Sequence, residues 1–210
     1  MTRNRPAASD ARRSAVAHLP LSDSDAAIVA AIRAGEAAGG AALYDRHHAY
    51  VRRVLMRVLG PDADLHDVLQ DVFVAAIDSI DRLIDPNALR SWLAAISVNQ
   101  VRMELRRRSR RRLIRLLPQS DLPEVPVPGH SPEHGEALRA TYHVLGRLSA
   151  DERIPFALRF IDGMELTEIA DACAVSLATT KRRLSSAQKK FTSIARTYPE
   201  LADWVEGAAS

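Results

Sequence analysis

The chain has 210 residues, of which 47% are hydrophobic and 5% are aromatic, and its formal net charge is +3. This length allows one large domain or two small ones, each with a buried core. Because Leu, Ala, Ile and Val supply most of the apolar content, the composition favours helices over sheets. The only cysteine, Cys173, excludes a disulfide framework and a cysteine-type zinc site. Its place on an apolar helix face indicates core packing.

The distribution of charge is more informative than its sum. Arginine is concentrated between residues 102 and 115, and basic residues dominate the stretch from 181 to 196. Clustered positive charge is typical of nucleic-acid binding, although a membrane surface is an alternative partner. No apolar run is long enough to span a bilayer, and the basic N-terminus lacks the apolar segment of a signal peptide. We therefore expect the protein to work in a reducing cytosol.

The N-terminal part of the chain begins with a segment that has no helical period. Residues 1–21 are polar and rich in alanine and arginine, which predicts a disordered basic arm. Capping residues then predict a first helix that ends near Gly35. The pair Gly39-Gly40 is expected to break the helical pattern before a second helix over residues 41–59, which a Gly-Pro pair ends.

A third helix is predicted over residues 62–80, with acidic residues on its outer face. Its expected buried residues are Leu65, Val68, Leu69, Val72, Phe73, Ala76, Ile77 and Ile80. A loop over residues 81–87 separates it from a long helix that reaches to about Arg112. Residues 22–114 are therefore predicted to form four helices that bury a common core as a compact bundle.

The sequence changes character after the long helix. Residues 115–135 contain five prolines, which predict an extended linker. Helical periodicity then resumes, and Ser149 and Glu152 have the spacing of a capping box at the start of a further helix. We predict a second helical domain over residues 136–197, followed by a tail over residues 198–210.

Residues 165–191 have the layout of a helix-turn-helix. A short apolar helix face ends at Cys173, a three-residue connection follows, and Ser176 stands where the next helix needs an N-cap. The expected inward face of that next helix is Leu177, Thr180, Leu184, Ala187, Phe191 and Ile194. Its outer face carries Thr179, Lys181, Arg182, Arg183 and Ser185. Such a helix fits the major groove, where early side chains meet base edges and cations neutralise phosphates.

An ordinary amphipathic helix pair with solvated charges is the alternative, because that is the usual meaning of a charge run. DNA reading is favoured because the run is almost purely positive and follows a capped turn. We therefore predict an all-α protein with two small helical domains, a four-helix domain and a helix-turn-helix domain, joined by a proline-rich linker.

Three passages stand out in chain order: Asp67–Phe73, Trp92–Asn99 and Val175–Leu184. They resemble motifs of the extracytoplasmic-function (ECF) group of bacterial RNA polymerase sigma factors. Asp67–Phe73 (DVLQDVF) is similar to the family's D-L-V-Q-E-x-F passage. Trp92–Asn99 (WLAAISVN), followed by an arginine-rich helix end, is similar to its W-L-x-x-I-A-x-N run. Val175–Leu184 (VSLATTKRRL) resembles I-S-x-G-T-V-K-S-R-L. The motifs stand in the family's order, and the resemblance covers roughly residues 24–195.

The resemblance implies that the first domain docks on the clamp of RNA polymerase core and reads the minus-10 promoter element. The clamp contact would use Asp67, Gln70 and Asp71. Unpaired bases would be held by the loop before Trp92 and by Asn99, Arg102, Arg106 and Arg107. An amide that reads a base edge and cations that neutralise the backbone suit that task. Without the resemblance, the acidic residues would be interpreted as solvated surface and Trp92 as core.

The second domain would by the same resemblance read the minus-35 duplex, and the linker would thread the polymerase cleft. The residues expected to contact the duplex are Thr179, Lys181, Arg182, Arg183 and Ser185. Several positions depart from the family's pattern: Met103, Ala174, Ala178, Thr180 and Ser186. Ala174 replaces the usual turn glycine, which costs about 1 kcal/mol if φ is positive there. Ala178 and Ser186 replace frequent Gly and Arg, so different DNA contacts are expected.

The leading hypothesis is a sigma factor without catalysis of its own and without a cofactor, cytoplasmic and associated with the nucleoid. Its partners would be polymerase core and promoter DNA, both duplex and single-stranded, and an anti-sigma protein is left open. One alternative is a helix-turn-helix regulator that acts without polymerase. Another is an enzyme with a metal site at His47, His48, His66 and Asp67. That site is disfavoured because adjacent residues point apart on a helix and no H-E-x-x-H spacing occurs.

Overall fold

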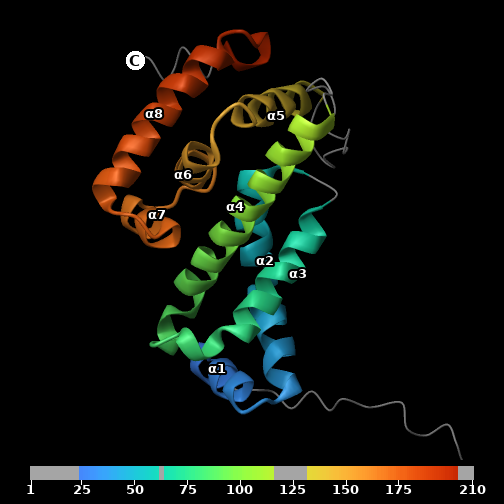
Figure 1. Cartoon of the computed structure of the whole chain (residues 1–210), viewed down its shortest axis with the longest axis vertical. Coiled ribbons are helices and arrows are strands. Elements are labelled where there is room, and N and C mark those ends of the chain that lie inside the picture. The colour runs from blue at the N-terminus through green and yellow to red at the C-terminus, as the bar shows by residue number, and fades with distance from the viewer. Residues whose placement is uncertain (1–23, 62–63, 116–131, 203–210) are drawn as a thin grey trace, which may run out of the picture.

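The computed structural model describes residues 24–61, 64–115 and 132–202, and within these ranges the chain is helical and has no β-strand. The helices are α1 (Asp25–Arg33), α2 (Ala37–Leu59), α3 (Leu65–Asp78), α4 (Leu89–Arg115), α5 (Pro132–Leu145), α6 (Ala150–Phe160), α7 (Leu166–Cys173) and α8 (Leu177–Ala195) (Figure 1). Short 3-10 turns occur at Ile80–Arg82, Pro86–Ala88 and Pro199–Leu201. In the described ranges no helix is long and apolar enough to cross a membrane.

Three predicted segments lie wholly or largely outside the described residues: the basic arm over 1–21, most of the linker over 115–135, and most of the tail over 198–210. The last residues assigned to the linker are nevertheless helical, because α5 begins at Pro132. Proline suits the first turn of a helix, since its missing N–H would have no intrahelical partner there.

The predicted break at Gly39-Gly40 is wrong, because α2 begins at Ala37 and continues through both glycines. Gly39 is buried against α1. A Cβ atom at this position would lie 2.7 Å from the backbone N of Ile32. The glycine therefore permits a close approach of two helices, and a sequence pattern alone does not distinguish that role from a break.

The predicted helix boundaries at capping residues are confirmed. Ser149 and Glu152 form the capping box of α6, and the Ser176 hydroxyl accepts a hydrogen bond from the Thr179 N–H at 3.2 Å at the start of α8. Gly60 ends α2 with φ of 82°. Ala174, between α7 and α8, has φ of 53° and ψ of 46°, so the condition of positive φ under which alanine is costly at this position is met.

Two expected core residues are partly exposed. Ile77 on α3 is 40% exposed and Leu177 at the start of α8 is 38% exposed. The Ile77 side chain lies next to Gly40, where a Cβ atom would be 3.3 Å from the Ile77 Cδ1 atom. Because Gly40 has no side chain, it leaves Ile77 uncovered. Leu177 is the first residue of α8, directly after the Ser176 cap.

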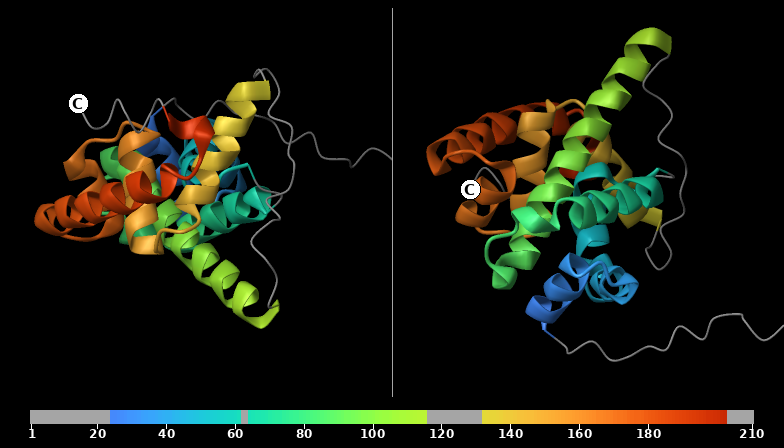
Figure 2. Two further views of the ribbon diagram at one scale, coloured as in Figure 1. Left: turned by 90° about the horizontal axis from the view of Figure 1, so that it is seen from above. Right: turned by 60° about the horizontal axis from the view of Figure 1, so that its bottom comes forward.

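The two halves of the chain do not have separate cores. The larger apolar cluster combines residues of α1–α4 with six from the second half: Ile154, Ala157, Leu158, Ile169, Ala172 and Cys173. A smaller cluster joins α5, α6 and α8 around Phe156 and Phe191, whose rings stack at 4.7 Å. Helices α6 and α7 thus lie directly against α2 and α4 (Figures 1 and 2).

Polar contacts also join the halves at the C-terminal end of α2. The buried Arg153 guanidinium donates to the carbonyl oxygens of Val58 (2.8 Å) and Leu59 (3.2 Å). The Tyr142 hydroxyl donates to the Met56 carbonyl at 2.9 Å. The last carbonyls of a helix have no intrahelical donor. Arg153 of α6 therefore supplies donors to the last two carbonyls of α2, and Tyr142 of α5 adds a second donor to the Met56 carbonyl, which also accepts the Gly60 N–H.

Gly60 makes this contact sterically possible. A Cβ atom at this position would lie 2.9 Å from the Tyr142 ring, so the glycine both ends α2 and admits an aromatic ring from the other half. Arg53 on α2 adds an ion pair of 3.0 Å to Asp162, which follows α6 and whose side chain is buried.

Candidate nucleic-acid interface

The solvent-facing side of α8 carries the cations predicted to read duplex DNA. Lys181, Arg182 and Ser185 are exposed on the first turns of the helix after the Ser176 cap. Thr179 is half-buried, and its hydroxyl accepts from the Ser176 hydroxyl at 3.0 Å. The first half of α8 therefore presents two cations and a hydroxyl in the geometry that a major groove accepts.

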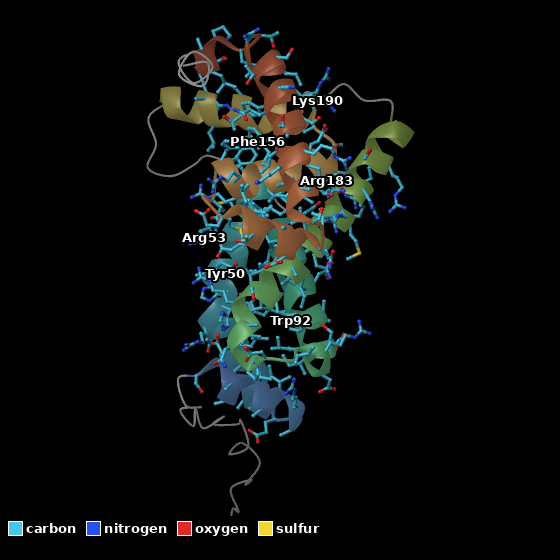
Figure 3. All side chains as sticks on the ribbon, turned by 90° about the vertical axis from the view of Figure 1, so that its left-hand side faces the viewer. Tyr50, Arg53, Trp92, Phe156, Arg183 and Lys190 are labelled. Carbon is cyan, nitrogen blue, oxygen red and sulfur yellow. The ribbon has the colours of Figure 1, made fainter. Side chains whose placement is uncertain are left out.

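Arg183 differs from the expectation that it lies on the same open face. This arginine, labelled in Figure 3, is half-buried. Its Nη2 atom lies 3.1 Å from the Asp151 carboxylate in the first turn of α6. Ser186, where the family often has arginine, faces α6 and donates to Glu152 at 2.8 Å. Arg183 and Ser186 therefore contact α6, and this side of α8 is not open to solvent.

Glu152 is the polar centre of the contact between α6 and α8. Its carboxylate accepts hydrogen bonds from Ser149, from Ser186 and from the Lys190 ammonium at 2.6 Å. Burial raises the pKa of this carboxyl, but the hydrogen bonds from Lys190, Ser149 and Ser186 outweigh burial and lower the pKa to about 2.

The lowered pKa of Glu152 predicts a loss of stability in acid. The carboxylate stabilises the fold fully above the pKa of the unfolded chain, and this contribution disappears as the pH falls from about 5 to about 2. Glu152→Gln should lower the free energy of unfolding by about 1–3 kcal/mol near pH 7. It should also flatten the acid dependence in urea denaturation. Glu136→Gln, an exposed change on α5, is the control, and the same acid dependence in both variants would contradict the assignment.

The residues predicted for single-strand binding lie along α4. Asn99 and Arg106 are exposed, and Arg102 donates to the Asn99 side-chain oxygen at 2.9 Å. Arg107 is held differently, since its guanidinium lies 2.6 Å from Glu104 and 3.4 Å from Asp64. The structure thus brings Asn99 and Arg102 together and neutralises Arg107 within the fold.

Glu104 is a residue that the sequence reasoning missed. It is 5% exposed and accepts from both Arg107 and Arg108. Burial raises the pKa of Glu104, but the two arginines overcome this effect, so the pKa lies below its ordinary value. The signal was available in the sequence, because a glutamate followed by arginine three and four residues later forms ion pairs on one helix face.

The acidic surface predicted to contact polymerase is open. Asp67, Gln70 and Asp71 are all exposed on α3, and Gln70 lies 3.2 Å from the His66 ring nitrogen. Helix α3 packs on α2 and α4 and lies on the side of α4 away from α6 and α7 (Figure 1). A partner could bind here without displacing the second half of the chain.

The loop before α4 presents a second feature that the sequence reasoning did not single out. Ile84 is 97% exposed, while its neighbour Leu83 is buried. Arg33 on α1 donates to the carbonyl oxygens of Ile80 and Leu83 and so fixes the loop. Trp92, just after the loop, is half-buried and packs on the larger cluster, as its core interpretation predicted.

The histidines considered as metal ligands have other partners. His47 is buried, with its Nε2 atom 3.2 Å from Asp25, and burial lowers its pKa more than Asp25 raises it. His48 stacks on the ring of Tyr44. Among residues 24–61, 64–115 and 132–202, no group of three or more His, Cys, Asp or Glu side chains is placed to hold a metal ion.

Two family models match the chain. Sigma-70 region 2 matches residues 43–111, which include α3 and most of α4, and Sigma-70 region 4 matches residues 138–191, which include the helix-turn-helix. Together these stretches make up more than half of the chain. They contain all the residues predicted for the polymerase and DNA contacts.

Similar proteins of known identity agree with this match. The ferric citrate uptake sigma factor FecI of Escherichia coli is 29% identical over 149 residues, or 69% of this chain and 84% of FecI. The ECF sigma factor SigL of Mycobacterium tuberculosis is 29% identical over 157 residues, or 74% of this chain and 88% of SigL. The sigma factor CnrH of Cupriavidus metallidurans is 26% identical over 182 residues, which are 82% and 94% of the two chains.

Solved structures show the same fold. The structure of CnrH in complex with the cytosolic domain of CnrY matches with a TM-score of 0.55 and 26% identity, over 84% of this chain and 99% of that one. The sigma factor RpoE of Bartonella quintana, solved with the anti-sigma factor NepR, matches with a TM-score of 0.56 and 20% identity, over 74% of this chain and 95% of that one. The chain therefore belongs to the sigma-70 family and is a sigma factor of the ECF group.

Proposed function

We propose that three surfaces, on α3, α4 and α8, carry the separate tasks of this sigma factor. As a member of its family the chain binds RNA polymerase and directs promoter recognition. The observation that supports the division is that the exposed acidic residues belong to α3 and the exposed cations to α8, two helices that lie on opposite sides of α4 (Figure 1). One face is thus available to a protein and the other to DNA.

The α3 surface, Asp67 with Gln70 and Asp71, is assigned to the clamp of polymerase core. The α8 surface, Lys181 and Arg182 with Thr179 and Ser185, is assigned to the minus-35 duplex. Arg183 joins this surface only when it leaves Asp151. Cations at phosphates supply affinity, and side chains near the start of the helix supply base discrimination.

The α4 surface is assigned to the unpaired minus-10 strand. Asn99 offers an amide to a base edge and Arg106 offers charge to the backbone, which Arg102 joins when it leaves Asp151. Arg107 contributes less than the sequence indicated, because Glu104 and Asp64 already neutralise it. No catalytic step and no cofactor is required of the chain in this role. We expect the protein to act in the cytoplasm, at the chromosome. An anti-sigma protein is a further candidate partner.

The experiment that tests this assignment measures binding to polymerase core and initiation in vitro. Charge reversal at α3, Asp67→Lys with Asp71→Lys, should weaken core binding at least about 100-fold, because the acidic side chains assigned to the clamp contact are then replaced by cations. The matched control, Asp45→Lys with Asp78→Lys, changes the same charge at other exposed positions and should retain most of the binding. Equal losses in both variants, or no initiation by the native chain with core, would refute the proposal.

A further inference from the structure

Asp151 contacts one arginine from each of the two proposed DNA-reading surfaces. Its Oδ2 atom lies 3.1 Å from Nη2 of Arg183 on α8, and its Oδ1 atom lies 3.8 Å from Nε of Arg102 on α4. Both arginines are largely covered, with 23% and 19% of their side chains exposed, whereas Asp151 is about half exposed. A single carboxylate therefore neutralises a cation from each surface.

The packing around this carboxylate holds the two surfaces together. Helix α7 lies against α4, and Ile169, Ala172 and Cys173 share a core with Val98 and Val101. Arg153, two residues after Asp151, is anchored on the end of α2. The position of Asp151 between the two arginines is thus determined by buried contacts and not by the ion pairs alone.

This arrangement is incompatible with simultaneous reading of both promoter elements. Elements about 25 base pairs apart along a duplex that rises about 3.4 Å per pair are separated by about 85 Å. A duplex this short is stiff, because its persistence length is about 150 base pairs. Two arginines that contact the same carboxylate cannot both lie on these elements.

We propose that Asp151 is an internal substitute for a DNA phosphate, which holds Arg102 and Arg183 in the free chain and must release them before the promoter is read. A carboxylate and a phosphate oxygen bind guanidinium groups in the same way, so each excludes the other. The proposal rests on the assignment of α4 and α8 to DNA. Polymerase or DNA must compensate for the loss of the two ion pairs.

The test compares Asp151→Asn with Asp171→Asn in binding of the full chain, without polymerase, to a random-sequence DNA duplex. Asp171 is an exposed residue on α7 of the same helix-turn-helix, so both changes remove one negative charge close to α8. Asp151→Asn should tighten binding by about two- to tenfold, since ion pairs to a half-exposed carboxylate are worth little individually. Asp171→Asn should tighten it less, through the general change of charge alone.

A double-mutant cycle tests whether Asp151→Asn tightens DNA binding through Arg102 and Arg183. In an Arg102→Ala, Arg183→Ala background, Asp151→Asn should no longer tighten binding beyond the Asp171→Asn control. A gain of equal size in both backgrounds, or no gain over the control in the native background, would overturn the proposal. Neither readout involves polymerase, so failure of initiation with core would refute the proposed function without deciding the role of Asp151.

Discussion

Replacing Lys181 and Arg182 together by alanine is expected to reduce initiation at minus-35-dependent promoters by about 10- to 100-fold. Both side chains are exposed on the first turns of α8, where a helix in the major groove makes its closest contacts. Binding to polymerase core should be unchanged, because α3 packs on α2 and α4 and is remote from this face. Transcription in vitro and a core-binding assay on the same preparation measure the two effects.

Lys189→Ala with Arg196→Ala is the matched control for this prediction. It removes the same charge from the far end of α8, where side chains are beyond the reach of base edges. Its loss of initiation should be much smaller. Promoter binding by the Lys181, Arg182 variant should also show a shallower dependence on salt, because fewer phosphates are neutralised. An equal loss in the two pairs would mean that α8 contributes only non-specific charge.

Arg153→Met is expected to lower the free energy of unfolding by about 2–5 kcal/mol. The substitution preserves an apolar stem of similar length but removes the guanidinium that donates to the Val58 and Leu59 carbonyls. These oxygens lie at the end of α2, where the described residues place no other donor, and the second half of the chain shields them from water. Urea denaturation followed by circular dichroism measures the change.

Arg159→Met serves as the comparison for the buried arginine. Arg159 also donates to a carbonyl, that of Met164 at 2.9 Å, but the contact is local and partly solvated. We expect a loss of less than about 1 kcal/mol for this variant, because water replaces the missing donor. Equal losses in the free energy of unfolding for Arg153→Met and Arg159→Met would mean that the contact of α6 with the end of α2 stabilises the fold no more than a local, partly solvated contact does.

Local features of this protein follow from its sequence because they depend on neighbours within one or two helical turns. The cap at Ser176, the capping box of Ser149 and Glu152, and the left-handed Ala174 were all predictable. The outward face of α3 and the order of the helices were predictable for the same reason. The incorrectly predicted helix break at Gly39 shows where prediction from local sequence fails, because the role of that glycine depends on its contact with Ile32 on another helix.

The sequence by itself determined the helices, their caps, and the faces on which Asp67, Asp71, Lys181 and Arg182 lie. Only the tertiary structure decided that α6 and α7 share a core with α4, that Arg107 is neutralised by Asp64, and that Asp151 reaches both Arg102 and Arg183. These contacts join residues more than 30 positions apart in the chain. Helical periodicity places a side chain on a face of its own helix but carries no information about which distant residue meets that face.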